Sequence, residues 1–169
     1  MRIGGSGGQG VVLAAQILGK AAVLDGKNAL QTQAYGAEAR GSLAESEVII
    51  SDNKIGFPAV RRPDVLVAMS QEALDRLLKD LKENGTLIID SSNVTKVPES
   101  KATVYRFPIT EAAKKTFGEA MYANMVMLGA FVRMTRLVTV QSMEKTIREN
   151  VSAKTVETNI NAFRRGLQL

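Results

Sequence analysis

The sequence contains neither cysteine nor histidine, and it has no tryptophan. Without cysteine the chain can form no disulfide, bind no iron–sulfur cluster through thiolates and offer no thiol nucleophile. Without histidine it lacks a common zinc ligand and the commonest acid–base catalyst. Catalysis by Asp, Glu, Lys, Ser or Tyr stays open, but the commonest catalytic machinery is missing.

Long apolar runs are missing as well. No stretch approaches the ~18 uninterrupted apolar residues that indicate a membrane-spanning helix. A glycine-rich stretch interrupts the N-terminal region, which therefore lacks the charged-then-apolar order of a signal peptide. We expect a cytoplasmic protein, and the 169 residues fit a single domain, 1–169, that is large enough to bury its own core.

The chain is basic, with a net charge of +5 and an isoelectric point of about 9.6. Its Lys and Arg residues are spread along the sequence without interleaved aromatic residues, and the densest pairs are Arg61-Arg62, Lys114-Lys115 and Arg164-Arg165. This pattern is typical of solvated surfaces, so we expect no nucleic-acid partner. Attraction to a phosphorylated cofactor or an acidic partner stays open.

Short apolar segments alternate with helical patterns along much of the chain. The run at 64–69 is continuously apolar, which is typical of a strand covered on both faces. The expected strands are a short first strand before the glycines and then 28–32, 46–51, 64–69, 86–90 and 102–105; the expected helices are 9–24, 71–83, about nine residues ending near 118, 120–132, 140–150 and 153–166. This order predicts an α/β fold: a three-layer, Rossmann-like domain with a mostly parallel sheet flanked by helices and a helical C-terminus.

Five of the seven residues from Gly4 to Gly10 are glycine. Gly5, Gly7 and Gly10 fit the G-x-G-x-x-G spacing that opens a strand–turn–helix unit, in which the backbone can approach a phosphate at the helix N-terminus. A tight turn with a structural role only, or a loop that faces another anionic ligand or a partner subunit, fits the same pattern.

Binding of NAD is the least favoured interpretation of these glycines. A dinucleotide site has an acidic residue about 20 positions on, at the end of the second strand, for the ribose. The sequence has Gln31-Thr32-Gln33 there, and the only nearby acid, Asp25, precedes Gly26, where the first helix should end.

The segment 120–132 is apolar on every face, so we expect it in the interior or beneath another subunit. Asn124 is its polar exception, either a satisfied core residue or a group exposed at an interface or site. If part of this helix is exposed, the isolated chain should form homodimers. Earlier in the chain, the polar residues Asp90 to Asn93 stand at the C-terminal end of the expected strand 86–90, where open α/β sheets bind ligands.

Several motifs together are more specific than any one. In sequence order they are Gly5-x-Gly-Gly-Gln-Gly-Val11, Tyr35-Gly-x-Glu-x-Arg-Gly41, Ser46-Glu-Val-Ile-Ile-Ser-Asp52, Pro63-Asp-Val-Leu-Val67 and Asn124-Met-Val-Met-Leu-Gly129. With them the chain resembles the gamma subunit of 2-oxoacid:ferredoxin oxidoreductases, most of all the 2-oxoglutarate (KorC-type) branch. The resemblance covers nearly the whole chain.

This resemblance implies an oxidoreductase of several subunits that decarboxylates a 2-oxoacid on thiamine diphosphate, passes electrons through iron–sulfur clusters to ferredoxin and forms an acyl-coenzyme A. The chain has no cysteine and no Gly-Asp-Gly diphosphate motif. The clusters, thiamine diphosphate and Mg²⁺ are therefore expected on alpha and beta subunits, with a delta subunit left open. The gamma subunit would be a structural partner, inactive alone, that contacts coenzyme A at most. The alternative function is a stand-alone Rossmann-like nucleotide-binding enzyme.

For the site, we hypothesise that the turn formed by Gly7, Gly8, Gln9 and Gly10 meets the loop from Tyr35 to Gly41 at the C-terminal edge of the sheet, facing coenzyme A or a neighbouring subunit. Arg40 would make a charge-assisted contact with a phosphate or carboxylate, and Glu38 could pair with Arg40 or with a basic partner residue. Asn124 completes this candidate set. An intrachain salt bridge or turn is the competing interpretation.

Overall fold

Six strands form one sheet in the part of the chain that the computed structural model describes, residues 1–35 and 43–169, with the backbone alone described for Ala34 and Tyr35. The order across the sheet is β2-β3-β1-β4-β5-β6. The strands are β1 (Arg2–Ser6), β2 (Asn28–Tyr35), β3 (Leu43–Ser51), β4 (Val65–Ala68), β5 (Thr86–Asp90) and β6 (Thr103–Phe107).

The sheet is mixed, with one strand reversed. Strands β1, β4, β5 and β6 pair in parallel, whereas β3 is antiparallel to both of its neighbours, β1 and β2. The expectation of a mostly parallel sheet is confirmed, whereas the reversed direction of β3 was not expected. Only residues 36–42 separate these strands, fewer than the dozen or so that a parallel crossover needs.

Strands β2 and β3 are also longer than their composition predicted. β2 continues past Thr32 to Tyr35, and β3 begins at Leu43 rather than Ser46. The two extensions pair with each other, with Gln33 opposite Ser46 and Tyr35 opposite Ala44. Backbone pairing therefore extends the ladder through residues whose polar character suggested a loop.

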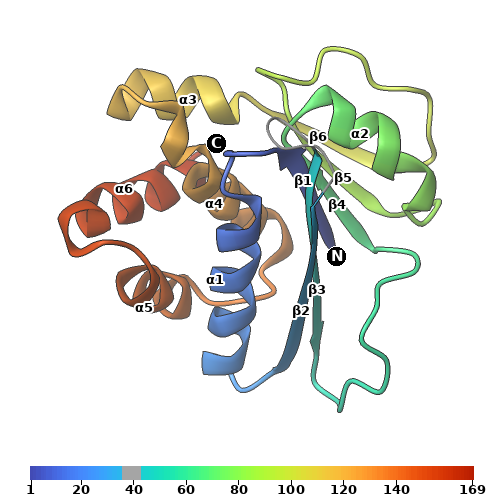
Figure 1. Cartoon of the computed structure of the whole chain (residues 1–169), viewed down its shortest axis with the longest axis horizontal. Helices are drawn as coiled ribbons and strands as arrows, with labels where there is room; N and C mark the ends of the chain where they lie inside the picture. Colours follow the sequence, from blue (N-terminus) through green and yellow to red (C-terminus); the bar gives the residue numbers. More distant parts are fainter. Residues whose placement is uncertain (36–42) are drawn as a thin grey trace.

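The helices lie on both faces of this sheet and form three layers with it (Figure 1). Helix α2 covers one face, and the other helices gather on the opposite face. None of the helices in the described ranges is both long and apolar enough to cross a bilayer. Their bounds are α1 (Val11–Leu24), α2 (Gln71–Leu77), α3 (Ile109–Phe117), α4 (Ala123–Thr135), α5 (Val140–Asn150) and α6 (Val156–Gly166), with short 3-10 turns η1 (Leu78–Asp80), η2 (Ala120–Tyr122) and η3 (Ala153–Thr155).

Strand β4 shows how one apolar run supports both layers. Val67 belongs to the core beneath the large helical layer, whereas Leu66 and Ala68 pack against α2. Alternate residues of a strand point to opposite faces, so a strand covered on both sides must be apolar throughout. The prediction of a doubly covered strand is confirmed.

Helix α2 is shorter than predicted. Ser70 caps its start, accepting a hydrogen bond from Ala73 N at 3.2 Å. The helix nevertheless ends at Leu77, and the chain becomes extended at Leu81 (φ −62°, ψ 138°). Lys82 N then donates to Pro63 O, which draws the backbone back toward the start of β4.

A buried cation joins the start of β1 to this second layer. Arg2 is 8% exposed, and its guanidinium contacts Glu47 at 2.7 Å, Asp80 at 2.6 Å and Glu45 at 2.8 Å. Burial opposes the positive charge, but hydrogen bonds with Glu47 and Asp80 hold the pKa of Arg2 above its usual value. This cluster ties β1 and β3 to the turn that follows α2.

Candidate functional site

The glycine-rich segment forms a tight turn between β1 and α1. Gln9 N donates to Ser6 O at 3.1 Å, closing the turn around Gly7 and Gly8. Gly8 has φ 92°, a conformation that non-glycine residues adopt only at a cost. Gly7 and Gly8 are exposed, so the apex of the turn presents backbone to the surroundings.

Gln9 fastens this turn to the neighbouring strand. Its Oε1 accepts from Ser6 N at 2.7 Å, and its Nε2 donates to Met69 O at 3.1 Å, just after β4. Met69 N in turn donates to Gly4 O at 2.8 Å. The Gln9 side chain therefore uses both of its polar ends inside the chain, where it sets the shape of the turn.

Asn124 supports the turn from the other side. It is 5% exposed, its Nδ2 donates to Gly10 O at 3.4 Å, and its Oδ1 accepts from Met125 N at 2.9 Å. Gly10 has φ 69°, and a Cβ atom there would collide with the Asn124 amide. Asn124 is thus a satisfied, buried polar residue that lies directly beneath the candidate site.

The rest of α4 follows the prediction of an interior helix. Every residue from Ala123 to Val132 is buried, and the predicted N-terminal end at 120–122 forms the turn η2 instead, where Met121 is exposed. The buried stretch leaves little apolar surface through which two copies of the chain could associate, so this helix gives no support to a homodimer.

The start of α1 has no capping side chain. Gly10 is its N-cap and provides no side-chain acceptor, and the first turn contains no acidic residue. The first N–H groups of a helix lack intrahelical partners and carry the positive end of the helix dipole. Together with the exposed glycines, they form a surface that can accept a phosphate or carboxylate oxygen.

The second predicted motif begins at the same edge of the sheet. Strand pairing places Gly5 opposite Ala44 and Ser6 opposite Leu43, and Ala44 is in turn opposite Tyr35. The two strand ends that flank residues 36–42 therefore lie beside the glycine turn. Glu38 and Arg40 lie outside the described residues, as does the side chain of Tyr35.

Asp25 has a structural task far from the glycine turn. Its carboxylate accepts hydrogen bonds from Ser142 Oγ at 2.6 Å, Thr139 N at 2.6 Å and Thr139 Oγ1 at 2.7 Å. Burial opposes ionisation of this group, but the bonds from Ser142 and Thr139 lower the pKa of Asp25 below its usual value. It lies at the opposite end of the 14-residue helix α1, about 21 Å from the turn, and cannot serve as a ribose acid there.

Asp90 is also used within the fold. It is fully buried, and its carboxylate accepts from Asn93 Nδ2 at 2.8 Å and from Thr110 N at 3.2 Å, at the start of α3. The position at a strand end was predicted correctly, but the side chain holds a helix rather than facing a ligand. Across the described ranges, no cluster of three or more acidic residues is arranged to bind a metal ion.

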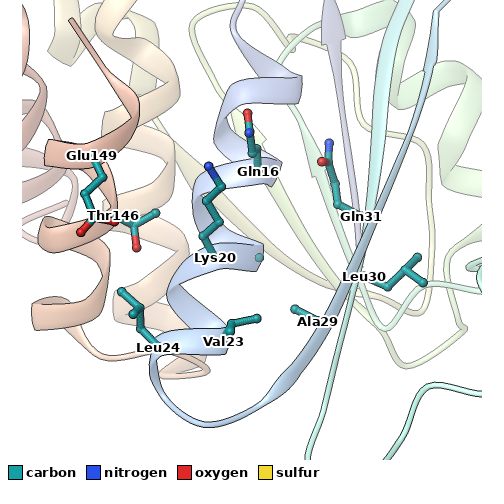
Figure 2. A pocket seen from close by; sticks show the side chains of 10 residues that line it. Gln16, Lys20, Val23, Leu24, Ala29, Leu30, Gln31, Thr146 and Glu149 are labelled. Carbon is teal, nitrogen blue, oxygen red and sulfur yellow. The ribbon is translucent and has the colours of Figure 1, made fainter.

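A groove that the sequence did not predict lies between α1, β2 and α5 (Figure 2). Its volume is about 570 Å³. Val23 and Leu24 are 56% and 45% exposed beside it. The sequence feature that could have indicated this groove is the number of apolar residues on α1, which exceeds what one apolar helix face needs. The lining residues are Gln16, Gly19, Lys20, Val23, Leu24, Ala29, Leu30, Gln31, Thr146 and Glu149.

The chain matches one family model over residues 1–169, that of pyruvate ferredoxin/flavodoxin oxidoreductase. It is 46% identical to the 2-oxoglutarate synthase subunit KorC of Methanocaldococcus jannaschii and 47% identical to that of Methanothermobacter marburgensis, covering 100% of this chain and 92% and 95% of those proteins. The structure resembles the crystal structure of a keto/oxoacid ferredoxin oxidoreductase gamma subunit from Geobacter sulfurreducens, with a TM-score of 0.87, 43% identity and coverage of 99% and 95%.

Proposed function

This chain belongs to the pyruvate ferredoxin/flavodoxin oxidoreductase family, and we propose that it works there as the gamma subunit of a 2-oxoglutarate:ferredoxin oxidoreductase (EC 1.2.7.3). The observation that carries this function is the likeness to KorC subunits over the whole of this chain. The complete reaction decarboxylates 2-oxoglutarate oxidatively, transfers the acyl group to coenzyme A and reduces ferredoxin.

The chain's own residues limit its share of that reaction. It has no cysteine with which to hold an iron–sulfur cluster. Alpha and beta subunits, and a delta subunit where one exists, would therefore hold the clusters and thiamine diphosphate with its Mg²⁺. The isolated chain would be inactive, and ferredoxin would meet the assembled complex rather than this subunit alone. A cytoplasmic location belongs to the same proposal.

Within the complex, the glycine turn would face coenzyme A. Exposed Gly7 and Gly8 let a bulky phosphate approach the backbone, and the uncapped start of α1 supplies N–H donors and a partial positive charge. Gln9 and Asn124 act indirectly, because their hydrogen bonds fix the turn. Arg40, in the neighbouring motif, would add a charge-assisted contact with the same anion, and Tyr35 and Glu38 would complete that rim.

Nothing in the described site favours a stand-alone nucleotide-binding enzyme. Asp25, the acid nearest in sequence to the expected ribose position, accepts a hydrogen bond from Thr139 N at the start of α5. Asp90 accepts one from Thr110 N at the start of α3. The glycine turn alone would be compatible with many phosphorylated ligands. Coenzyme A carries phosphate groups that the turn could accept, and it is also a substrate of the family's reaction.

Purification of the tagged chain from its native host tests the proposed function. We expect a complex that contains thiamine diphosphate and iron–sulfur clusters and that reduces ferredoxin with 2-oxoglutarate and coenzyme A. Pyruvate and branched-chain 2-oxoacids, assayed in the same preparation, should give much lower kcat/KM. A chain that purifies alone with a bound nucleotide would contradict the assignment, and a preference for pyruvate would move it to another branch of the family.

A further inference from the structure

The two edges of the sheet are protected unequally. β6 forms one edge with five residues, carries exposed Arg106, and is followed directly by Pro108. β2 forms the other edge with eight residues, and neither charge nor proline occurs from Asn28 to Tyr35. Natural proteins normally block a long edge strand with charges, proline or a bulge, because its free N–H and C=O groups pair readily with another strand.

Beside this edge lies the groove between α1, β2 and α5, which is open in the structure (Figure 2). Exposed Val23 and Leu24 supply apolar surface next to the strand. Lys20 and Glu149 place one cation and one anion on the same lining. An unblocked edge next to apolar surface is the pattern of a strand that is covered in the assembled protein.

The sequence of β2 is close to self-complementary. Counted outward from Thr32, its neighbours are Gln31 and Gln33, and the next pair is Leu30 and Ala34. If two copies of the strand pair antiparallel with Thr32 opposite itself, each glutamine meets a glutamine and each apolar residue an apolar one. The strand contains no charged residue, so no like charges face each other along such a ladder.

The same register keeps the faces of the sheet consistent. Residues directly opposite in an antiparallel ladder point to the same face, so Gln31 of one copy and Gln33 of the other would both lie on the side of α1. The two α1 helices would then flank the two-fold axis on one face.

We propose that two copies of this chain associate through β2, antiparallel and centred on Thr32, to form a continuous sheet of twice six strands in the described ranges. The partner that fits this edge is a second copy of the same chain. The inference does not rest on the proposed function, because the isolated full-length chain can be tested for dimers without any enzymatic activity.

Cysteine crosslinking tests the register directly, because the natural chain has no cysteine. Thr32→Cys puts a single thiol on the proposed axis, and copper-phenanthroline would oxidise two such thiols to a disulfide. We expect most of this variant to migrate as a crosslinked dimer on a non-reducing gel. Thr103→Cys, at the exposed start of the other edge strand, is the matched control and should stay largely monomeric.

A second variant tests the association without a thiol. The wild-type chain should have about twice the mass of one 18.2 kDa chain in light scattering. Gln33→Lys puts two lysines into the proposed ladder and should weaken the dimer at least about tenfold. Gln141→Lys makes the same charge change at an exposed position of α5 and should leave the mass unchanged.

Three results would overturn the inference. The first is an 18.2 kDa particle at all accessible concentrations, and the second is equal crosslinking of the Thr32→Cys and Thr103→Cys variants. The third is crosslinking of Thr32→Cys to a different subunit in the purified complex, which would assign this edge to that subunit. Circular dichroism of each variant confirms that the fold is retained.

Discussion

The side-chain amide of Asn124 lies against the backbone of Gly10, so the start of α4 supports the start of α1. This contact joins residues that are 114 positions apart, and it leaves no room for a Cβ atom at Gly10. Two independent constraints therefore act on one glycine: a positive φ of 69° and a neighbouring side chain. The shape of the turn depends on both.

Replacing Gly10 should test that dependence. Gly10→Ala should lower the free energy of unfolding by about 3 kcal/mol, because the left-handed backbone is strained and the methyl group displaces Asn124. Gly8→Ala shares the positive φ but has nothing within 4 Å of the added atom, so its loss should be only about 1 kcal/mol. Urea unfolding of both variants makes the comparison, and equal losses would argue against the steric role of Asn124.

A second pair of glycines tests the packing of α4 against α6. A Cβ at Gly129 would collide with the backbone of Phe163 and Gly166, so Gly129→Ala should force the helices apart and cost about 3 kcal/mol or more. Gly19 is also a buried helical glycine, but its added Cβ would meet nothing within 4 Å. Gly19→Ala should therefore stabilise the chain by about 0.5–1 kcal/mol. In thermal unfolding, the midpoint temperature should fall for Gly129→Ala and rise for Gly19→Ala. A shift of both midpoints in the same direction would contradict the close packing of α4 against α6.

The bonds to Asp25 predict a particular pH dependence. Because its folded pKa lies below the ordinary value of 3.8, the carboxylate contributes stability above that value and loses it as the pH falls through the folded pKa. Asp25→Asn should cost about 1 kcal/mol near neutral pH, since the start of α5 loses its anionic partner. The difference from wild type should shrink as the pH falls below about 4.

Denaturant titrations at several pH values make this measurement. Glu99→Gln, an equivalent change at an exposed position, is the control and should alter the stability little at any pH. A deficit of Asp25→Asn that stayed constant from neutral pH down to about pH 2 would show that the effect does not arise from the charge of Asp25.

The parts of the fold that the sequence predicted are those set by local pattern. The apolar run of β4 and the glycine turn each follow from spacing and residue type over a few positions. The reversal of β3 was not predictable in that way, because strand direction depends on which strands pair. Gln9 likewise contacts Met69, which is 60 residues away, and no local pattern encodes that bond.

The candidate site was predicted in part for the same reason. The glycines were recognisable, but the support given by Asn124 required the crossing of α4 with α1 to be known. The groove beside β2 was not predicted, because helix periodicity says how much of α1 is apolar but not how α1 packs against β2 and α5. The exposure of Val23 and Leu24 follows from that packing.

We propose that the glycine turn faces coenzyme A in the assembled enzyme. The most direct test of this position is the KM for coenzyme A of complexes that contain Gly8→Asp, Gly8→Asn or Gly26→Asp. Asp and Asn strain the backbone alike at Gly8, so the difference in KM between these two variants reports the effect of the negative charge alone. Gly26 has a similar φ of 81° and open surroundings at the far end of α1, so Gly26→Asp is the positional control.

We predict that Gly8→Asp raises the KM for coenzyme A about tenfold over Gly8→Asn, a difference of ~1.4 kcal/mol, and leaves the KM for 2-oxoglutarate unchanged. Gly26→Asp should behave like the wild type. An unchanged KM for coenzyme A in a fully assembled Gly8→Asp complex would contradict the claim, as would failure of that complex to assemble, which would place the turn against a neighbouring subunit instead.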